Sequence, residues 1–258
     1  MKTRIISGVI GFLILFTVVL MGGPLLTVSG LLISLIGLYE FNNAMNKING
    51  LKPIKCINYI LTIILYILIV IDKQNLFMLL LSAYTISLLC ILVIDNKTKI
   101  ADIAITALGA LYIPFLISHI TLLSGSIYIW IIFITAWGTD TFAYFVGVTI
   151  GKRKLCPNLS PNKSIEGSIG GILGSLGVTL LFSYYFKLES IFLLAILSIV
   201  CSILAQFGDL TASRIKRLAN IKDFGNIMPG HGGILDRFDS ILFTAPIVYY
   251  YMVIFVLV

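Results

Sequence analysis

The stretch LFMLLLSAYTISLLCILVI, residues 76–94, is an uncharged apolar run, and the polar stretch DNKTK, residues 95–99, follows it. An α-helix of about 20 apolar residues can cross the hydrocarbon core of a bilayer. Eight more runs of this kind occur, so the predicted spans are 5–20, 24–41, 54–71, 76–94, 100–118, 126–148, 167–186, 190–207 and 239–257. Only 11% of the residues are charged, against about 25% in soluble domains. The sequence therefore predicts an all-α, polytopic membrane helix bundle.

Lysine and arginine predict which side of the membrane each loop faces. Lys2 and Arg4 precede the first apolar run, as in a signal peptide, but no small-residue cleavage site is clear. We interpret this run as the first transmembrane helix. With a cytoplasmic N-terminus, 16 of the 18 basic residues fall on the cytoplasmic side, and only Lys73 and Lys187 fall outside. Because basic residues concentrate in cytoplasmic loops, we expect the N-terminus in the cytoplasm.

This orientation places two long loops, about 149–166 and 208–238, on the cytoplasmic side, whereas the outside loops are short. We expect residues 1–125 to form N-terminal transmembrane helices. Residues 126–258, with the two long loops, are expected to form the catalytic membrane region. A transporter would more often place its polar groups near the middle of the bilayer.

The second long loop and its borders concentrate charge of both signs. Nine of the chain's 29 charged residues lie between Asp209 and Asp239, and four of the nine are aspartates. Binding of anionic lipid headgroups would explain the basic residues but not the acids. Carboxylates bind Mg²⁺, which bridges to substrate phosphates, and lysine and arginine neutralise phosphate charge. The glycines of PGHGG, residues 229–233, allow backbone N–H groups to approach an anion. The loop therefore predicts a site for a metal and phosphates.

Helix capping is the alternative for each of these aspartates. In GDLTAS, residues 208–213, the glycine would end one helix and Asp209 would cap the next. Asp236 would cap the last span, with Asp239 in its first turn. The local pattern does not separate capping from metal binding, and the two roles can coexist.

The first long loop contains SPNKSIEG, residues 160–167. Lys163 and Ser164 are candidates for phosphate binding. The alternative is cap chemistry, in which Ser160 or Ser164 acts together with Glu166 at the start of the next helix. The preceding basic residues 152–154 fit an ordinary cluster of cytoplasmic positive charge.

Glycines open the seventh span, and the pairs 167/171 and 170/174 have GxxxG spacing. This spacing is typical of close helix packing in membranes. Asp140 lies inside the sixth span, where Asp140, Tyr144 and Gly147 share one helix face. An ionisable residue within a span indicates function, so Asp140 is expected to line a polar cavity; a hydrogen-bonded structural aspartate is the alternative.

The run SRIKRLANIKDFGNIMPGHGGILDRFD, residues 213–239, resembles the signature of the phosphatidate cytidylyltransferases, or CDP-diacylglycerol synthases, of bacterial type. The shared pattern fixes more than ten positions within this run. Residues 137–167, QFGDLTASRIKR and DSILFTAPIVYY are also similar to this family, so the resemblance covers most of 130–250. The N-terminal half resembles it only as a series of apolar spans. Met228 departs from the Leu, Ile or Phe expected before the proline, a volume-conserving change.

The resemblance implies transfer of CMP from CTP to phosphatidate, giving CDP-diacylglycerol and pyrophosphate for phospholipid biosynthesis. It also implies Mg²⁺, with K⁺ as a candidate second cation. It implies a homodimer in the bacterial plasma membrane, among membrane lipids, with its active site facing the cytoplasm; no nucleic-acid partner is expected.

Roles for individual residues follow from the resemblance together with the charge pattern. The predicted metal ligands are Asp209, Asp236 and, as a weaker candidate, Asp239. The predicted catalytic residues are Ser213, Lys216, His231 and Arg237. The predicted substrate-binding residues are Asp140, Lys163, Ser164, Glu166, Arg217, Lys222, Gly232 and Gly233.

Three other functions compete with this one. A CTP-dependent polyprenol or lipid kinase would release CDP, and a related enzyme would transfer CMP to an archaeal ether lipid. A transporter of an anionic substrate belongs to another class of protein. The transporter is disfavoured because the sequence has no obvious internal repeat and its polar residues cluster in cytoplasmic loops.

Overall fold

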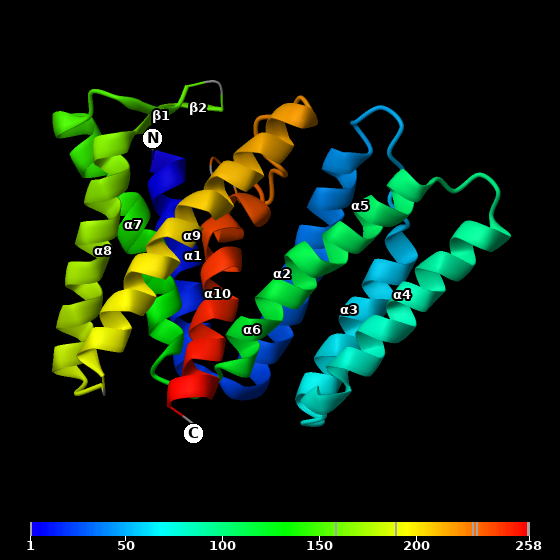
Figure 1. Cartoon of the computed structure of the whole chain (residues 1–258), viewed down its shortest axis with the longest axis horizontal. Coiled ribbons are helices and arrows are strands. Elements are labelled where there is room, and N and C mark those ends of the chain that lie inside the picture. Colours follow the sequence, from blue (N-terminus) through cyan, green and yellow to red (C-terminus); the bar gives the residue numbers. More distant parts are fainter. Residues whose placement is uncertain (1, 158, 189, 229, 231, 257–258) are drawn as a thin grey trace. The chain divides into compact units, whose positions relative to one another are not determined.

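The predicted spans form helices. The computed structural model describes residues 2–157, 159–188, 190–228, 230 and 232–256, and within them a helical segment lies on each of the nine apolar runs (Figure 1). The segments are α1 (Lys2–Met21), α2 (Gly23–Met45), α3 (Lys55–Val70), η1 (Gln74–Leu76) with α4 (Phe77–Ile94), α5 (Ile100–Ala110) with the π-helical turn η2 (Leu111–Phe115) and α6 (Leu116–Leu122), α7 (Ile129–Ile150), α8 (Ile165–Tyr185), α9 (Ile191–Leu218) and α10 (Leu235–Phe255). The prediction of an all-α, polytopic fold is confirmed.

Helix length separates the spans into two groups. Within the described residues, seven helical segments are long and apolar enough to cross a membrane. The apolar helix Lys55–Val70 is shorter, and at 1.5 Å per residue it is about 24 Å long. The hydrocarbon core of a bilayer is about 30 Å thick. The count of nine crossings and the cytoplasmic N-terminus therefore stay predictions.

The chain divides into two compact units. One comprises Met1–Gly125 and Leu218–Arg237, and the other comprises Ser126–Arg217 and Phe238–Val258. Residues 218–237 group with the N-terminal helices in these units. The expected division into residues 1–125 and a catalytic region 126–258 stays a prediction.

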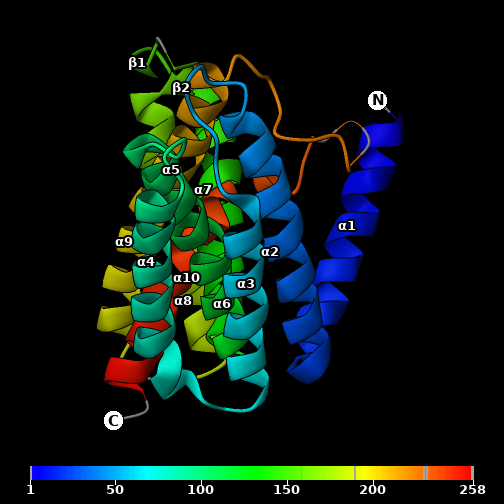
Figure 2. The same cartoon turned by 90° about the vertical axis from the view of Figure 1, so that its right-hand side faces the viewer.

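The first unit is built around α2, which lies between α1 and α3 (Figure 2). Its interior contains a buried polar network: the Tyr84 hydroxyl donates to Asn58 Oδ1 at 2.7 Å, and Asn58 Nδ2 donates to the carbonyl oxygen of Thr106 at 3.0 Å. Leu61 and Leu88 pack nearby. Polar groups are stable in an apolar interior when they are hydrogen-bonded to each other, so this network ties α3, α4 and α5 together.

In the second unit, α7 and α8 are in close contact (Figure 1). A Cβ atom on Gly167 would lie 2.7 Å from the carbonyl oxygen of Ala143, and one on Gly171 would lie 2.7 Å from that of Thr139. Only glycine allows the two backbones to approach so closely. The packing role predicted from the glycine spacing is therefore confirmed.

The two long loops contain more regular structure than was expected. Helix α9 continues through Gly208 and Asp209 to Leu218, so the first part of the expected loop 208–238 is helical. Hydropathy falls where a helix leaves the bilayer, but residues such as Leu, Ala, Arg and Lys favour its continuation in water. The expected loop 149–166 contains an antiparallel hairpin of β1 (Lys154–Cys156) and β2 (Ser160–Ser164).

Candidate active site

A cavity of about 500 Å³ lies in the second unit beside α7, α8 and the β1–β2 hairpin. Its polar lining consists of Asp140, Tyr144, Lys154, Ser160, Asn162, Lys163, Ser164, Ser168 and Gln206. Asp140, Tyr144 and Gly147 all line this cavity, which confirms the prediction that they share one face of their helix. A few polar groups of this kind orient a ligand in a pocket.

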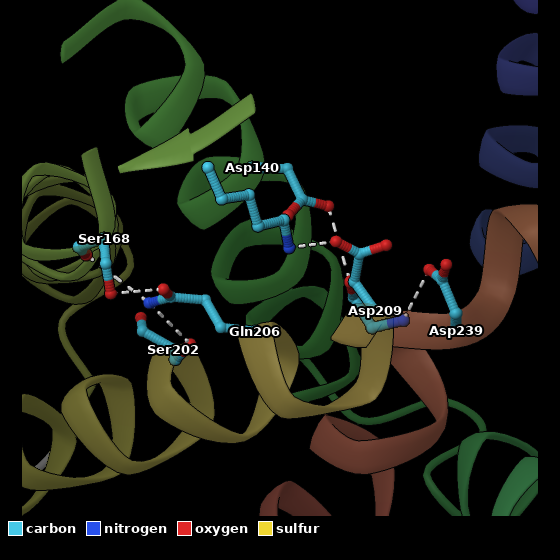
Figure 3. Close-up of polar contacts among 8 residues, drawn as sticks. Asp140, Ser168, Ser202, Gln206, Asp209 and Asp239 are labelled. Atoms are coloured by element: carbon cyan, nitrogen blue, oxygen red, sulfur yellow. Dashed lines mark hydrogen bonds and ion pairs between the residues drawn. The ribbon is translucent and has the colours of Figure 1, made fainter. Parts of the chain in front are cut away.

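An ion pair lies at this cavity and joins two predicted site residues. The ammonium group of Lys163, on β2, contacts Oδ2 of Asp209, on α9. Asp140, on α7, lies on the other side of Asp209 from Asp239 (Figure 3). Oδ2 of Asp140 accepts a hydrogen bond from the hydroxyl of Ser240 at 3.4 Å. Four elements, β2, α7, α9 and α10, therefore bring their polar side chains together.

Asp239, on α10, is the most buried member of this group, at 9% exposed. It interacts electrostatically with the like charges of Asp209 and Asp140 and with the opposite charge of Lys216. Like charges held close together repel one another, and a cation placed among them relieves the repulsion. These charged side chains form the acidic cluster, which consists of Asp140, Lys163, Asp209, Lys216 and Asp239.

A glycine explains how α9 and α10 bring their aspartates so close. A Cβ atom on Gly208 would collide with the carbonyl oxygen of Asp239 and would lie 3.0 Å from the Phe243 ring. Because glycine has no Cβ, the two helices can touch at this point. Asp209 follows Gly208 directly and is thereby placed beside Asp239.

The structure decides between capping and other roles for two of the aspartates. Asp209 lies in the interior of α9, so it does not cap a new helix, and the capping interpretation of GDLTAS is wrong. Helix α10 begins at Leu235, and Asp236 is the acidic residue of its first turn. Asp239 lies beyond that turn, where its Oδ1 accepts the N–H of Ser240 at 2.7 Å. Asp239 is therefore not in the position of a first-turn cap.

Asp236 belongs to the first unit and shapes the turn before α10. Its Oδ2 accepts the N–H of Phe224 at 2.8 Å and the N–H of Gly233 at 2.9 Å. Gly233 was predicted to direct this N–H toward a phosphate, whereas in the structure it donates to Asp236. Gly232 has a φ of +89°, a conformation that favours glycine. The N–H of Gly233 therefore serves the turn itself, and the predicted contact of Gly232 with substrate stays a prediction.

The start of α8 is capped as the sequence suggested. The Ser164 hydroxyl accepts the N–H of Gly167 at 3.1 Å, which is the N-cap geometry. Oε2 of Glu166 accepts the N–H groups of Lys152 and Arg153 at 3.0 and 3.1 Å. Glu166 therefore holds the segment before β1 against the first turn of α8. Its predicted contact with substrate stays a prediction.

The other predicted residues lie around these features. The last turns of α9 carry Ser213, Lys216 and Arg217. Of these three, Lys216 belongs to the acidic cluster, because it interacts with Asp239. Arg217, Lys222 and Arg237 are exposed. His231 lies outside the described residues.

Two polar residues were missed in the sequence. Gln206, one turn before Asp209, is 8% exposed and lines the cavity. Its Oε1 accepts the hydroxyl of Ser168, and its Nε2 donates to the carbonyl oxygen of Ser202 at 3.4 Å (Figure 3). Glu40, on α2, is 2% exposed. The available signal was the same for both: a strongly polar residue inside an apolar span.

The donors in the acidic cluster suit Mg²⁺ in one of its usual binding modes. Among the described residues, no group of three or more acidic, histidine or cysteine side chains forms a metal site by itself. Mg²⁺ in phosphate-transferring sites is commonly held by one or two carboxylates, with substrate phosphates and water completing the coordination. The neighbouring carboxylates of Asp209 and Asp239 fit that requirement.

Comparison with known proteins gives a consistent result over the whole chain. The family model described as "Cytidylyltransferase family" matches residues 2–255. A protein of Staphylococcus haemolyticus named phosphatidate cytidylyltransferase is 38% identical over 257 residues, covering 96% of this chain and 97% of that protein. Proteins with the same name from Staphylococcus aureus and Bacillus subtilis are 34% and 31% identical. They cover 96% and 99% of this chain, and 97% and 98% of their own lengths.

Proposed function

The chain belongs to the cytidylyltransferase family, and we propose that it is a phosphatidate cytidylyltransferase. It transfers CMP from CTP to phosphatidate and releases CDP-diacylglycerol and pyrophosphate, a step of phospholipid biosynthesis. The observation that carries this function is the full-length match to relatives of that name. The acidic cluster beside a polar cavity is the arrangement that such a reaction requires.

The reaction needs charge neutralisation more than proton transfer. An oxygen of the phosphatidate phosphate attacks the α-phosphorus of CTP. The bond from that phosphorus to the oxygen bridging to the β-phosphorus then breaks, and its electron pair leaves with pyrophosphate. A phosphate monoester is already largely ionised at neutral pH, so the nucleophile needs no strong base. The protein must align the two substrates and offset their negative charge.

Lys163 and Lys216 are proposed to contact the phosphates. Both lie beside carboxylates of the acidic cluster, and Lys163 also lines the cavity. When a phosphate enters, the ammonium of Lys163 can turn from Asp209 to the phosphate oxygens, because a lysine side chain is a flexible point charge. Arg237, Arg217, Lys222, Ser213 and His231 stay predicted contacts from the sequence.

Asp209 and Asp239 are proposed to hold Mg²⁺, and Asp236 stays a predicted ligand from the family resemblance. When bound, Mg²⁺ would stabilise the negative charge that develops on the leaving pyrophosphate. The adjacent carboxylates of Asp209 and Asp239 support this proposal, since each makes the other a stronger attractor of cations. A second, monovalent cation such as K⁺ stays a prediction.

The protein is a multi-pass membrane protein by its apolar helices. We further propose that it lies in the bacterial plasma membrane as a homodimer, with the acidic cluster on the cytoplasmic side. The asymmetry of 16 basic residues against 2 supports this orientation. It also suits the substrates, because phosphatidate stays in the leaflet while CTP and pyrophosphate are soluble.

The purified chain in detergent, with CTP, Mg²⁺ and phosphatidate, tests the proposed function. We expect pyrophosphate release that depends on phosphatidate, together with a cytidine-labelled lipid product. Release of CDP and a phosphorylated lipid would instead identify a lipid kinase. A preference for an archaeal ether lipid over phosphatidate would identify that variant of the transferase. Absence of turnover with every lipid, together with uptake of an anionic solute by liposomes containing the chain, would favour a transporter.

A further inference from the structure

Glu40 is a buried carboxylate that contacts the beginning of α10. The residue lies on α2 and is 2% exposed. Its Oε1 accepts the N–H of Ile234 at 3.0 Å, and its Oε2 accepts the N–H of Leu235 at 2.9 Å. The first N–H groups of a helix have no partner within the helix. Glu40 supplies that partner from a distant, much earlier segment of the chain.

The turn before α10 is built to admit this carboxylate. A Cβ atom on Gly233 would lie 2.6 Å from Oε2 of Glu40, and one on Gly225 would lie 2.9 Å from its Cδ. Neither position has room for a larger residue. One turn earlier on α2, Gly37 also faces α10, because a Cβ there would lie 3.1 Å from Leu235. The face of α2 that carries Gly37 and Glu40 therefore fits the start of α10.

Glu40 and Asp236 together use the N–H groups at this helix end. Glu40 accepts those of Ile234 and Leu235, and Asp236 accepts that of Gly233. A helix N-terminus with free N–H groups is a common phosphate site, but here these donors are paired with carboxylates of the chain itself. These three N–H groups are therefore occupied by Glu40 and Asp236 and are not free for a substrate phosphate.

We infer that Glu40 is a positioning residue for the proposed transferase reaction: it fixes the turn 222–236 and the start of α10. The inference rests on the proposed function. The turn carries Lys222 and Asp236, and α10 continues from it to Asp239. Charge-assisted hydrogen bonds in a water-poor site are stronger than those between neutral groups. Loss of Glu40 should therefore release the turn and slow turnover without removing any group that touches substrate.

Two substitutions at Glu40 and one matched control test this inference. Glu40→Gln keeps the size of the side chain, but its amide has one acceptor oxygen for two N–H donors. Glu40→Asp keeps the carboxylate on a shorter side chain. Asp102→Asn is the control, because Asp102 is also a buried carboxylate, 5% exposed, that accepts two backbone N–H groups, those of Lys52 and Lys99. Its partners lie outside the turn 222–236.

The measurements are amide hydrogen exchange of the peptide that covers Ile234 and Leu235, and kcat per folded enzyme with CTP, Mg²⁺ and phosphatidate. For Glu40→Gln we expect exchange at these two amides to rise about tenfold and kcat to fall about tenfold. Glu40→Asp should recover part of both losses. Asp102→Asn should lower thermal stability while leaving both quantities at their wild-type values.

The outcomes separate this inference from the proposed function. Wild-type exchange at Ile234 and Leu235 in Glu40→Gln would overturn it, as would the same loss of kcat in Asp102→Asn. If Glu40→Gln does not fold, the same two measurements on Glu40→Asp decide, with smaller changes in the same direction expected. If the wild-type chain makes no CDP-diacylglycerol, the proposed function fails, while the exchange measurement still tests the contact.

Discussion

The ammonium group of Lys163 contacts the carboxylate of Asp209, which ties strand β2 of the β1–β2 hairpin to helix α9. Each side chain is about a quarter exposed, at 27% and 26%. Because both groups are partly shielded from water, removing one partner leaves the other with an uncompensated charge. The pair also keeps the hairpin beside the cavity that both Lys163 and Asp140 line.

Asp209→Asn tests the central acid of the cluster. We expect pyrophosphate release to fall about a hundredfold or more at saturating Mg²⁺, because the amide carries no charge to hold a cation. Asp95→Asn is the control: Asp95 is exposed and accepts hydrogen bonds from its near neighbours Lys97 and Thr98. Both variants should insert into the membrane at wild-type levels. Near-normal turnover of Asp209→Asn would show that this carboxylate is not a metal ligand.

Lys163→Gln tests the proposed contact with CTP. We expect KM for CTP to rise about tenfold, the effect of losing one charge-assisted hydrogen bond to a phosphate. Lys163→Arg should be less impaired, because it retains the positive charge. Lys73→Gln removes an exposed lysine of a predicted outside loop and should leave KM unchanged. A wild-type KM in Lys163→Gln would restrict Lys163 to its contact with Asp209.

Gly208→Ala tests the close approach of α9 and α10. The added methyl group would collide with the carbonyl oxygen of Asp239, and overpacking of this kind destabilises by about 1–3 kcal/mol. Gly177→Ala is the matched control, because a Cβ there, on α8, meets no atom within 4 Å. Alanine at Gly177 should be neutral or stabilise by about 0.5–1 kcal/mol, as alanine favours a helix over glycine. Thermal unfolding and pyrophosphate release measure the two effects, and equal stability of both variants would contradict the packing argument.

The helices and one face of the site could be predicted from the sequence because their signals are local. An uncharged apolar run as long as 76–94 specifies a membrane helix whatever surrounds it. The face shared by Asp140, Tyr144 and Gly147 follows from helical periodicity alone. The packing of α7 against α8 likewise follows from glycines at GxxxG spacing.

The rest depends on contacts between distant segments, which a single sequence does not display. Nothing near Glu40 in the sequence indicates that its carboxylate binds Ile234 and Leu235, close to the other end of the chain. Gly233 was predicted to serve a phosphate. A glycine that lets the backbone approach an anion looks the same in the sequence whether that anion is a ligand phosphate or the carboxylate of Glu40. Hydropathy also misplaced the end of α9, since it reports the edge of the bilayer and not the end of the helix.

Asp239→Asn tests whether the neighbouring carboxylates act together on a cation. Asp239 interacts with the like charges of Asp209 and Asp140, so neutralising it lowers the negative charge that attracts Mg²⁺. We expect the Mg²⁺ concentration for half-maximal turnover to rise about tenfold, with activity largely recovered at high Mg²⁺. Removal of divalent cations with EDTA should abolish turnover of the wild type, and added Mg²⁺ should restore it. Asp72→Asn, which neutralises an exposed aspartate, is the control for net charge and should leave the Mg²⁺ dependence unchanged. A loss of activity in Asp239→Asn that no Mg²⁺ concentration relieves would contradict the expected recovery, and an unchanged Mg²⁺ dependence would show that Asp239 does not act on the cation.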